Sequence, residues 1–268
     1  MNIDIKQEIK KIVLNTQNFK YTFLKKHPNS KYSLDFIIDE ILYFLKSGVS
    51  YRMLRSKANF RTIHYYHSKF VKHNIFFKLY KKIRNIYINK YYTNKDAILL
   101  IDSTIINNKF GINKIGRNKF YKNKKSTKIS LMTDNHGFPL SILFMKGNYH
   151  DTCLFEKHIK DACVLFPKSN KKIIADKAYA SHHNYALLKQ KNIEHIIPPR
   201  KNMKIYHSYT YDKNEYIKRT IIENIFARLK INRRLSFRYE KFLRNFSSFV
   251  FLAFSYISIN IGKNTNVH

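Results

Sequence analysis

Cysteine is scarce in this 268-residue chain, and the two that occur exclude several kinds of architecture. Cys153 and Cys163 lie ten residues apart, which matches neither a zinc-ligand spacing nor a disulfide framework. We therefore expect two reduced thiols in an intracellular protein. The first six residues, Met-Asn-Ile-Asp-Ile-Lys, also lack the layout of a signal peptide.

Long apolar runs are lacking as well. The longest, residues 246–261, is interrupted by serines and one asparagine, and it is shorter than the roughly 18–20 residues that span a bilayer. We expect this segment to be a buried C-terminal helix, and nothing in the sequence indicates a membrane.

Acidic residues are few: 17 Asp and Glu stand against 51 Lys and Arg, a formal net charge of +34. Such an excess opposes compact folding unless a polyanion neutralises it, and nucleic acid is the usual one. A bias of AT-rich genomes towards Lys, Asn, Ile and Tyr is the alternative explanation. Because 44% of the residues are hydrophobic, the chain can still bury a core.

Residues 1–92 have helical patterns and almost no strand signal. Ser33 is positioned to cap a helix that ends at Gly48, a second helix begins at Ser50, and a third covers 61–77. Short basic helices with tight turns are compatible with a helix-turn-helix DNA reader and with any small helical bundle. The charge favours the DNA reader.

Strand signals begin after residue 95 and then alternate with helical patterns. This order predicts an α/β fold with a mixed sheet flanked by helices over 93–268, preceded by a small all-helical domain over 1–92. We expect strands at 97–101, 172–176 and 194–197, a hairpin at 127–146, helices at 151–166, 182–191 and 213–235, and a basic mobile loop at 106–126.

Two of these strands end in an aspartate, Asp102 and Asp176. The ends of strands in open α/β sheets border the crevice where ligands bind. Each aspartate alone is more often a turn or cap residue. Because acids are scarce in this chain, two carboxylates with apolar flanks indicate a site.

The third candidate is Glu223, in the middle of the expected helix 213–235. At about 100° per residue, Tyr216, Arg219, Glu223 and Lys230 share an arc of about 60°, roughly opposite a stripe of isoleucines. An ordinary solvated face with a Glu–Arg pair explains the same pattern. Three convergent carboxylates would instead hold two Mg²⁺ ions that cleave a phosphodiester, with Arg219 and Lys230 on flanking phosphates.

Several motifs together resemble the DDE transposases of bacterial insertion sequences, of the type grouped with insertion sequences four and five. The Tyr216-x2-Arg219-x3-Glu223-x6-Lys230 spacing matches the family's Tyr-Arg-Glu-Lys signature in every interval. The other matching segments are Ile101-Asp102-Ser103-Thr104, Ser126-Thr127-Lys128-Ile129, Gly147-Asn148-Tyr149-His150-Asp151 and Ile174-Ala175-Asp176-Lys177-Ala178-Tyr179. Residues 38–77 resemble the family's helix-turn-helix region, although the usual Trp after the glycine turn is absent and Tyr51 stands nearest.

The resemblance implies an RNase H-like catalytic domain with Asp102, Asp176 and Glu223 as catalytic metal ligands. It implies cleavage of transposon ends, transfer of the freed 3′-hydroxyl to target DNA, and two Mg²⁺ ions for which Mn²⁺ can substitute. We expect double-stranded DNA as the partner, a homodimer when two ends are paired, and a place inside the cell with the DNA. The expected DNA-contacting side chains are Tyr216, Arg219, Lys230, Lys128 and Lys177.

Some alternatives stay open at this point. His150 and Asp151 either assist DNA or metal near the site, or Asp151 caps the next helix with His150 packed beside it; we favour the cap. His182 and His183 are interpreted as a helix start. The whole chain could also be a catalytically idle transposase descendant that binds DNA, a nuclease without strand transfer, or a basic structural nucleic-acid binder.

Overall fold

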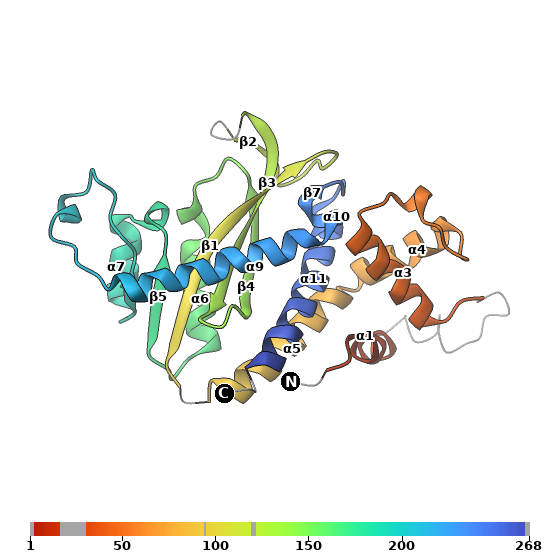
Figure 1. The fold of residues 1–268 in the computed structure, drawn as a ribbon, viewed down its shortest axis with the longest axis horizontal. Coiled ribbons are helices and arrows are strands. Elements are labelled where there is room, and N and C mark those ends of the chain that lie inside the picture. Colours follow the sequence, from red (N-terminus) through yellow and green to blue (C-terminus); the bar gives the residue numbers. More distant parts are fainter. Residues whose placement is uncertain (1–2, 17–30, 94, 119–121, 266–268) are drawn as a thin grey trace. The chain divides into compact units, whose positions relative to one another are not determined.

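The computed structural model describes residues 3–16, 31–93, 95–118 and 122–265 (Figure 1). By its contacts the chain forms two compact units. Unit 1 comprises Met1–Ile83, Lys109–Asn113 and Arg228–Val267, and unit 2 comprises Arg84–Asn108 and Lys114–Ala227. An independently folding boundary at residues 92 and 93 stays a prediction.

Unit 2 contains a mixed β-sheet, as the order of strand and helix signals predicts. Its strands follow the order β2-β3-β1-β5-β6, with β4 also paired to β3. The β1–β3, β2–β3 and β3–β4 pairs are antiparallel, whereas β1–β5 and β5–β6 are parallel. The strands are β1 Ala97–Asn108, β2 Gly116–Asn118, β3 Lys124–Asp134, β4 Pro139–Lys146, β5 Lys171–Ala175 and β6 Glu194–Ile196.

Strand β1 is longer than its apolar run. Leu99, Leu100 and Ile101 are fully buried. The sequence predicts that the strand stops at Asp102, and this prediction is wrong. The strand continues to Asn108, paired with β3 down to Asn107 opposite Ser126. The ladder joins backbone groups and is indifferent to side-chain polarity, so polar residues continue the strand beyond the hydrophobic run.

The expected loop 106–126 is also wrong in part. Its first residues belong to β1, Gly116–Asn118 form β2, and its last residues begin β3. Asn118 is buried and donates a hydrogen bond to the carbonyl oxygen of Gly147 (3.0 Å). In β2 the buried position is taken by a polar side chain whose hydrogen bond satisfies a backbone group. The sequence of this strand therefore has no hydrophobic pattern from which it could be predicted.

Helices cover both faces of this sheet. The part of α9 (Thr220–Ile231) that lies in unit 2 runs across one face (Figure 1), where Ile222 and Ile225 are buried. Gly137, at φ +81° in the β3–β4 turn, leaves room for this helix, because a Cβ there would lie 2.9 Å from Ile225 Cδ1. On the other face, His158 of α6 (Phe155–Leu165) bonds Ser130 of β3 at 2.8 Å.

The expected helix 213–235 is confirmed over 213–231 and wrong at its end. The chain is helical without a break through α8 Lys213–Tyr216, the 3₁₀ turn η6 Ile217–Arg219 and α9, and is interrupted at Asn232 before α10 Arg233–Ser236. Hydrophobic periodicity does not distinguish a 3₁₀ turn from an α-helical one over three residues, since their rotations differ by only about 20° per residue. The other helical elements of unit 2 are η3 Asp151–Leu154, η4 Lys177–Tyr179, α7 His182–Gln190 and η5 Lys204–Tyr206.

Unit 1 is mainly helical. Its elements are α1 Ile5–Leu14, α3 Leu34–Ser47, η1 Tyr51–Met53, α4 Phe60–Lys72, the first half of α5 Ile75–Tyr91, α10, the two-residue strand β7 Phe237–Arg238 and α11 Leu243–Asn264. Ser33 Oγ accepts a hydrogen bond from Phe36 N (3.2 Å), and Gly48 ends α3 at φ +72°. Both confirm the predicted limits of that helix.

Two other helix predictions in unit 1 are wrong. The segment that begins at Ser50 forms only the three-residue η1. The expected helix 61–77 is interrupted at Asn74, whose φ of +54° reverses the chain between α4 and α5. Asparagine tolerates this left-handed conformation better than most residues, and apolar periodicity on both sides conceals the break.

Helix α11 is long and apolar enough to cross a membrane by length and composition, and it is the one such helix among the described residues. Of its most apolar 18-residue window, 72% is buried inside the protein. It contacts α4 and α10 within unit 1, and Ser248 bonds the buried His67 at 3.1 Å. These contacts are those of a core helix, as the sequence predicts. Both cysteines are free thiols.

Candidate active site

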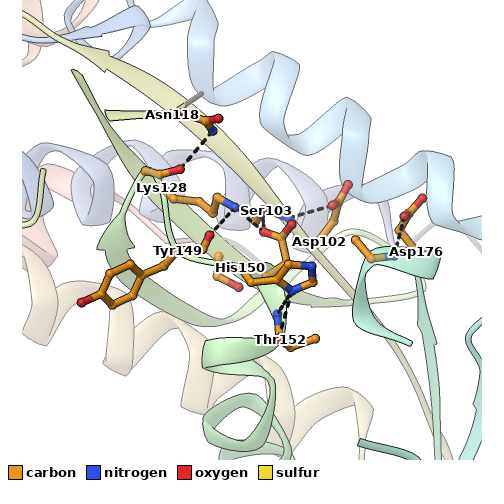
Figure 2. Close-up of polar contacts among 12 residues, drawn as sticks. Asp102, Ser103, Asn118, Lys128, Tyr149, His150, Thr152 and Asp176 are labelled. Carbon is orange, nitrogen blue, oxygen red and sulfur yellow. Dashed lines mark hydrogen bonds and ion pairs between the residues drawn. The ribbon is translucent and has the colours of Figure 1, made fainter. Parts of the chain in front are cut away.

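The sheet places Asp102, inside β1, beside Asp176, which directly follows β5. In the parallel pair of β1 and β5, Ile101 is opposite Ala175, so Asp102 and Asp176 are the next residues on neighbouring strands. Neighbouring strands lie about 4.8 Å apart. Figure 2 shows both carboxylates near each other. Residues 74 positions apart in the chain thus meet at one edge of a crevice.

Asp102 is held in a partly buried setting. Its Oδ1 accepts a hydrogen bond from the backbone N–H of Ser103 (2.7 Å). Burial raises the pKa of Asp102 from 3.8 to about 6, and the nearby Asp176 and Asp151 add to that rise. The Ser103 N–H and the guanidinium of Arg219 act in the opposite direction. A bound cation would therefore stabilise the charged form of this carboxylate.

Glu223 joins the two aspartates through Arg219. The Arg219 Nη2 atom lies 2.8 Å from Glu223 Oε1, one helical turn further along, and Nη1 lies 3.5 Å from Asp102 Oδ2. Although burial opposes the charge of Arg219, the carboxylates of Glu223, Asp102 and Asp176 raise its pKa overall, as does Tyr216. One guanidinium therefore interacts with all three candidate carboxylates.

A hydrogen-bonded cluster around the carboxylate of Asp151 supports the strand that carries Asp102. Asp151 Oδ1 accepts hydrogen bonds from Ser103 Oγ and from Lys128 Nζ, the latter at 2.8 Å. Lys128 also donates to the backbone oxygen of Tyr149 at 2.9 Å (Figure 2). Since Ser103 directly follows Asp102, this cluster fixes the backbone that carries the first aspartate.

The favoured interpretation of Asp151 as a helix cap is wrong. His150 is the N-cap residue of η3, and its Nδ1 accepts a weak hydrogen bond from Thr152 N at 3.4 Å. The carboxylate of Asp151 is turned to Lys128 and Ser103 instead, because a buried ammonium group needs a counter-charge. His182 does begin α7, with Ser181 as its cap, as predicted.

Tyr179 is a residue of the site to which the sequence analysis gave no role. It is 1% exposed, and burial raises the pKa of its hydroxyl well above the ordinary value, as do Asp151 and Asp102. The phenol therefore stays protonated. Tyr179 stands two residues after Lys177, in the motif from which only Asp176 and Lys177 were assigned roles. That position is the signal in the sequence that could have identified it.

A cavity of about 730 Å³ opens beside Asp176. Cations and aromatic rings line most of it, including Lys177, Arg200, Lys201, Tyr206 and Tyr211. Arg200 Nη2 donates to the backbone oxygen of Ala178 (2.9 Å) and lies 3.2 Å from His150 Nε2. No role for Arg200 follows from the sequence, because its partners lie 22 and 50 positions away in the chain.

The expected DNA-contacting residues have different environments. Lys177 and Lys230 are exposed, and Tyr216 is half-buried with its ring 5.9 Å from the Arg219 guanidinium carbon. Lys128 is 6% exposed and engaged by Asp151 and Tyr149. Of the five, Lys128 is the one whose charge is directed inwards.

The donor set suits a hard divalent cation. Asp102 and Asp176 each use Oδ1 to accept a backbone N–H, which leaves Oδ2 for another ligand. Carboxylate oxygens are the ligands that Mg²⁺ prefers. As placed, no three His, Cys, Asp or Glu side chains in the described part of the chain lie close enough to share a metal. The Arg219 cation lies between Asp102 and Glu223, where a metal with these ligands would also lie.

A mixed sheet with carboxylates on adjacent strands, covered by a helix that carries a third, defines an RNase H-like catalytic domain. The sequence profile of the transposase DDE domain matches residues 93–258, more than half of the chain. The protein therefore belongs to the transposase DDE domain family, which generally uses divalent metal ions and carries out nuclease and transesterification chemistry.

A solved transposase structure shares this fold, and a second transposase structure is matched at a much lower score. A piggyBac transposase in a synaptic complex with hairpin DNA aligns with 99% of this chain and 76% of its own, at 11% identity and a TM-score of 0.57. The catalytic domain of Mos1 mariner transposase aligns with 68% of this chain and 92% of its own, at 11% identity and a TM-score of 0.27. A search of curated proteins finds no match.

Proposed function

We propose that this protein is a DNA transposase that cleaves transposon ends and transfers the freed 3′-hydroxyl into target DNA. Asp102, Asp176 and Glu223 are the ligands of two Mg²⁺ ions, which Mn²⁺ can replace. The observation that carries the proposal is the placement of Asp102 and Asp176 on adjacent parallel strands, with Glu223 tied to Asp102 through one arginine. Three acids meet here in a chain that has only 17.

Each group has a distinct task in this proposal. The metal ions, when bound, lower the pKa of water and neutralise charge on the reacting phosphate. Asp102, Asp176 and Glu223 fix the ions, while the Ser103 hydroxyl and Lys128 hold Asp151 and so steady the strand behind Asp102. The protonated Tyr179 closes the floor of the site against water.

Double-stranded DNA is the proposed partner. The net charge of +34 supports it, as does the related fold of a piggyBac transposase in a synaptic complex with hairpin DNA. Lys177, Arg219 and Lys230 contact backbone phosphates, with Tyr216 beside them. Two copies act together when two ends are paired, inside the cell where the DNA is.

Sequence choice is assigned to the N-terminal helical region. The segment 1–92 acts as the DNA-binding domain, with a helix-turn-helix in the region of α3, η1 and α4, and 93–268 as the catalytic domain. Exposed cations on α4 such as Arg61 and Lys72 support this assignment, since phosphate contacts fix the position of a reading helix on the duplex.

The test is cleavage of a labelled linear duplex that carries the DNA flanking the gene. With Mg²⁺, the wild-type protein should nick or cut the end, and Asp102→Ala, Asp176→Ala and Glu223→Gln should each abolish cutting. Binding measured in Ca²⁺ should be retained, because removing a carboxylate removes repulsion from phosphate. Glu156→Gln, the same change at an exposed site on α6, is the matched control.

One observation favours a second candidate function. Arg219 already neutralises Asp102 and Glu223, as an arginine does in a structural ion-pair network. A catalytically idle, transposase-derived DNA-binding protein would keep such a network without any metal. In that case wild type and Glu223→Gln bind DNA equally and neither cuts it with Mg²⁺ or Mn²⁺.

A further inference from the structure

Arg219 occupies the centre of the carboxylate set. Its two terminal nitrogens approach different acids, Glu223 at 2.8 Å and Asp102 at 3.5 Å. Its side chain is 21% exposed, and that of Asp102 is 20% exposed. A partly buried ion pair with forked geometry is stronger than a surface pair and persists in the absence of other ligands.

A metal ion and this guanidinium compete for the same oxygens. Asp102 uses Oδ1 for the Ser103 N–H, so Oδ2 is the oxygen left for a metal, and Oδ2 is the atom that faces Arg219. Two cations cannot both sit against Asp102 and Glu223 without strong repulsion at such short range. Arg219 in this position therefore weakens metal binding to Asp102 and Glu223.

We propose that Arg219 is the internal counter-ion of the metal-free site, and that arrival of a DNA phosphate draws it away and opens the site to the metal. The inference rests on the proposed function, since it takes Asp102 and Glu223 as metal ligands. Arg219 is a positioning residue in this scheme: it acts on the metal through the carboxylates that it releases.

In its observed position the guanidinium already lies beside an aromatic ring that can hold it when the carboxylates release it. The Tyr216 ring lies 5.9 Å from the guanidinium carbon, and Tyr211, 5.4 Å from Tyr216, continues the aromatic surface to the cavity beside Asp176. Cation–π contact stabilises an arginine that turns away from the carboxylates. A phosphate there accepts both arms of the fork, so DNA binding offsets the ion pairs that are lost.

The exchange makes the two ligands cooperative. If DNA removes the competitor of the metal, DNA raises metal affinity, and by thermodynamic linkage the metal raises DNA affinity by the same factor. Without DNA, the site therefore binds metal more weakly. Coupling between sites is typically 5–150-fold in affinity, which sets the scale to expect.

The experiment is Mn²⁺ titration of the full chain by electron paramagnetic resonance of free Mn²⁺, with and without a short duplex and with the duplex alone as blank. Arg219→Gln should bind Mn²⁺ roughly ten-fold more tightly than wild type without DNA, within the range of coupled sites. The duplex should raise wild-type affinity by a similar factor and leave Arg219→Gln almost unchanged. Arg219→Lys, which keeps the charge but not the fork, should lie between the two.

Controls distinguish failure of the counter-ion role from failure of the proposed function. Arg228→Gln removes an exposed arginine of α9, the helix that follows η6, and should behave as wild type. Equal or weaker Mn²⁺ binding by Arg219→Gln without DNA, while Glu223→Gln loses the site, overturns the counter-ion role and leaves the metal ligands standing. Absence of any Glu223-dependent Mn²⁺ binding, with or without DNA, overturns both.

Discussion

Replacing Asp102 by Asn should stabilise the metal-free protein at neutral pH. Burial, which is the largest cause, and the neighbouring acids raise the pKa of Asp102 from 3.8 to about 6. The folded chain therefore binds this proton more tightly than the unfolded chain does. The stability from this group is full below pH 3.8 and is lost as the pH rises through about 6.

The size of the effect follows from the shift. About two pKa units at 1.36 kcal/mol each give an upper value of about 3 kcal/mol between pH 4 and pH 7. Because the Asp102 side chain is only 20% exposed, solvent screening reduces this moderately, and about 1–3 kcal/mol is expected. Asparagine keeps the shape of the protonated acid and does not titrate.

Thermal unfolding in chelator across pH 4–8 tests the reasoning. Wild type and Asp102→Asn should unfold at similar temperatures near pH 4, and the variant should become more stable as the pH rises to 7. The gap should reach several degrees, at roughly 2–4 °C per kcal/mol for a chain of this size. Asp96→Asn, at an exposed site, is the control. A wild type that gains stability over Asp102→Asn between pH 4 and 7 would refute the account of this carboxylate.

Three further outcomes follow from other contacts. Lys128→Met should lower the free energy of unfolding in urea by about 3 kcal/mol, because it leaves Asp151 charged and unpaired. Adding Asp151→Leu should restore much of that loss, and a double variant whose loss is the sum of the two single losses would contradict the pairing. His67→Phe should cost about 1–3 kcal/mol, since Tyr51 and Ser248 lose their shared partner; thermal unfolding equal to wild type would show that this network contributes nothing. DNA affinity should fall at least 10³-fold between 50 and 200 mM salt if six or more phosphates are contacted, and a flat salt profile by fluorescence anisotropy would exclude phosphate-dominated binding.

The sequence predicts the sheet well where hydrophobic pattern and geometry coincide. The apolar runs before Asp102 and Asp176 locate β5 and the first part of β1, and the parallel pairing places the two aspartates side by side. The turn residues after Asp134 locate the β3–β4 hairpin. The spacing from Arg219 to Glu223 gives a helical pair, because side chains four residues apart are neighbours on a helix.

What the sequence does not predict depends on tertiary contact. The approach of Arg219 to Asp102 joins residues more than a hundred positions apart, and no local pattern encodes it. The turn of Asp151 away from a cap position follows from the buried ammonium of Lys128 on another strand. The break at Asn74 depends on the left-handed φ of +54° at one residue between two helical patterns.

The central claim is that Asp102, Asp176 and Glu223 form one metal-dependent cleavage site, and the most direct test is cutting of the labelled DNA end by Glu223→Gln. This variant keeps the shape and helix propensity of the side chain and loses only its charge. The account predicts binding close to wild type in Ca²⁺ and no cleavage in Mg²⁺, beside full cleavage by wild type and Glu156→Gln. Full cleavage by Glu223→Gln would contradict it.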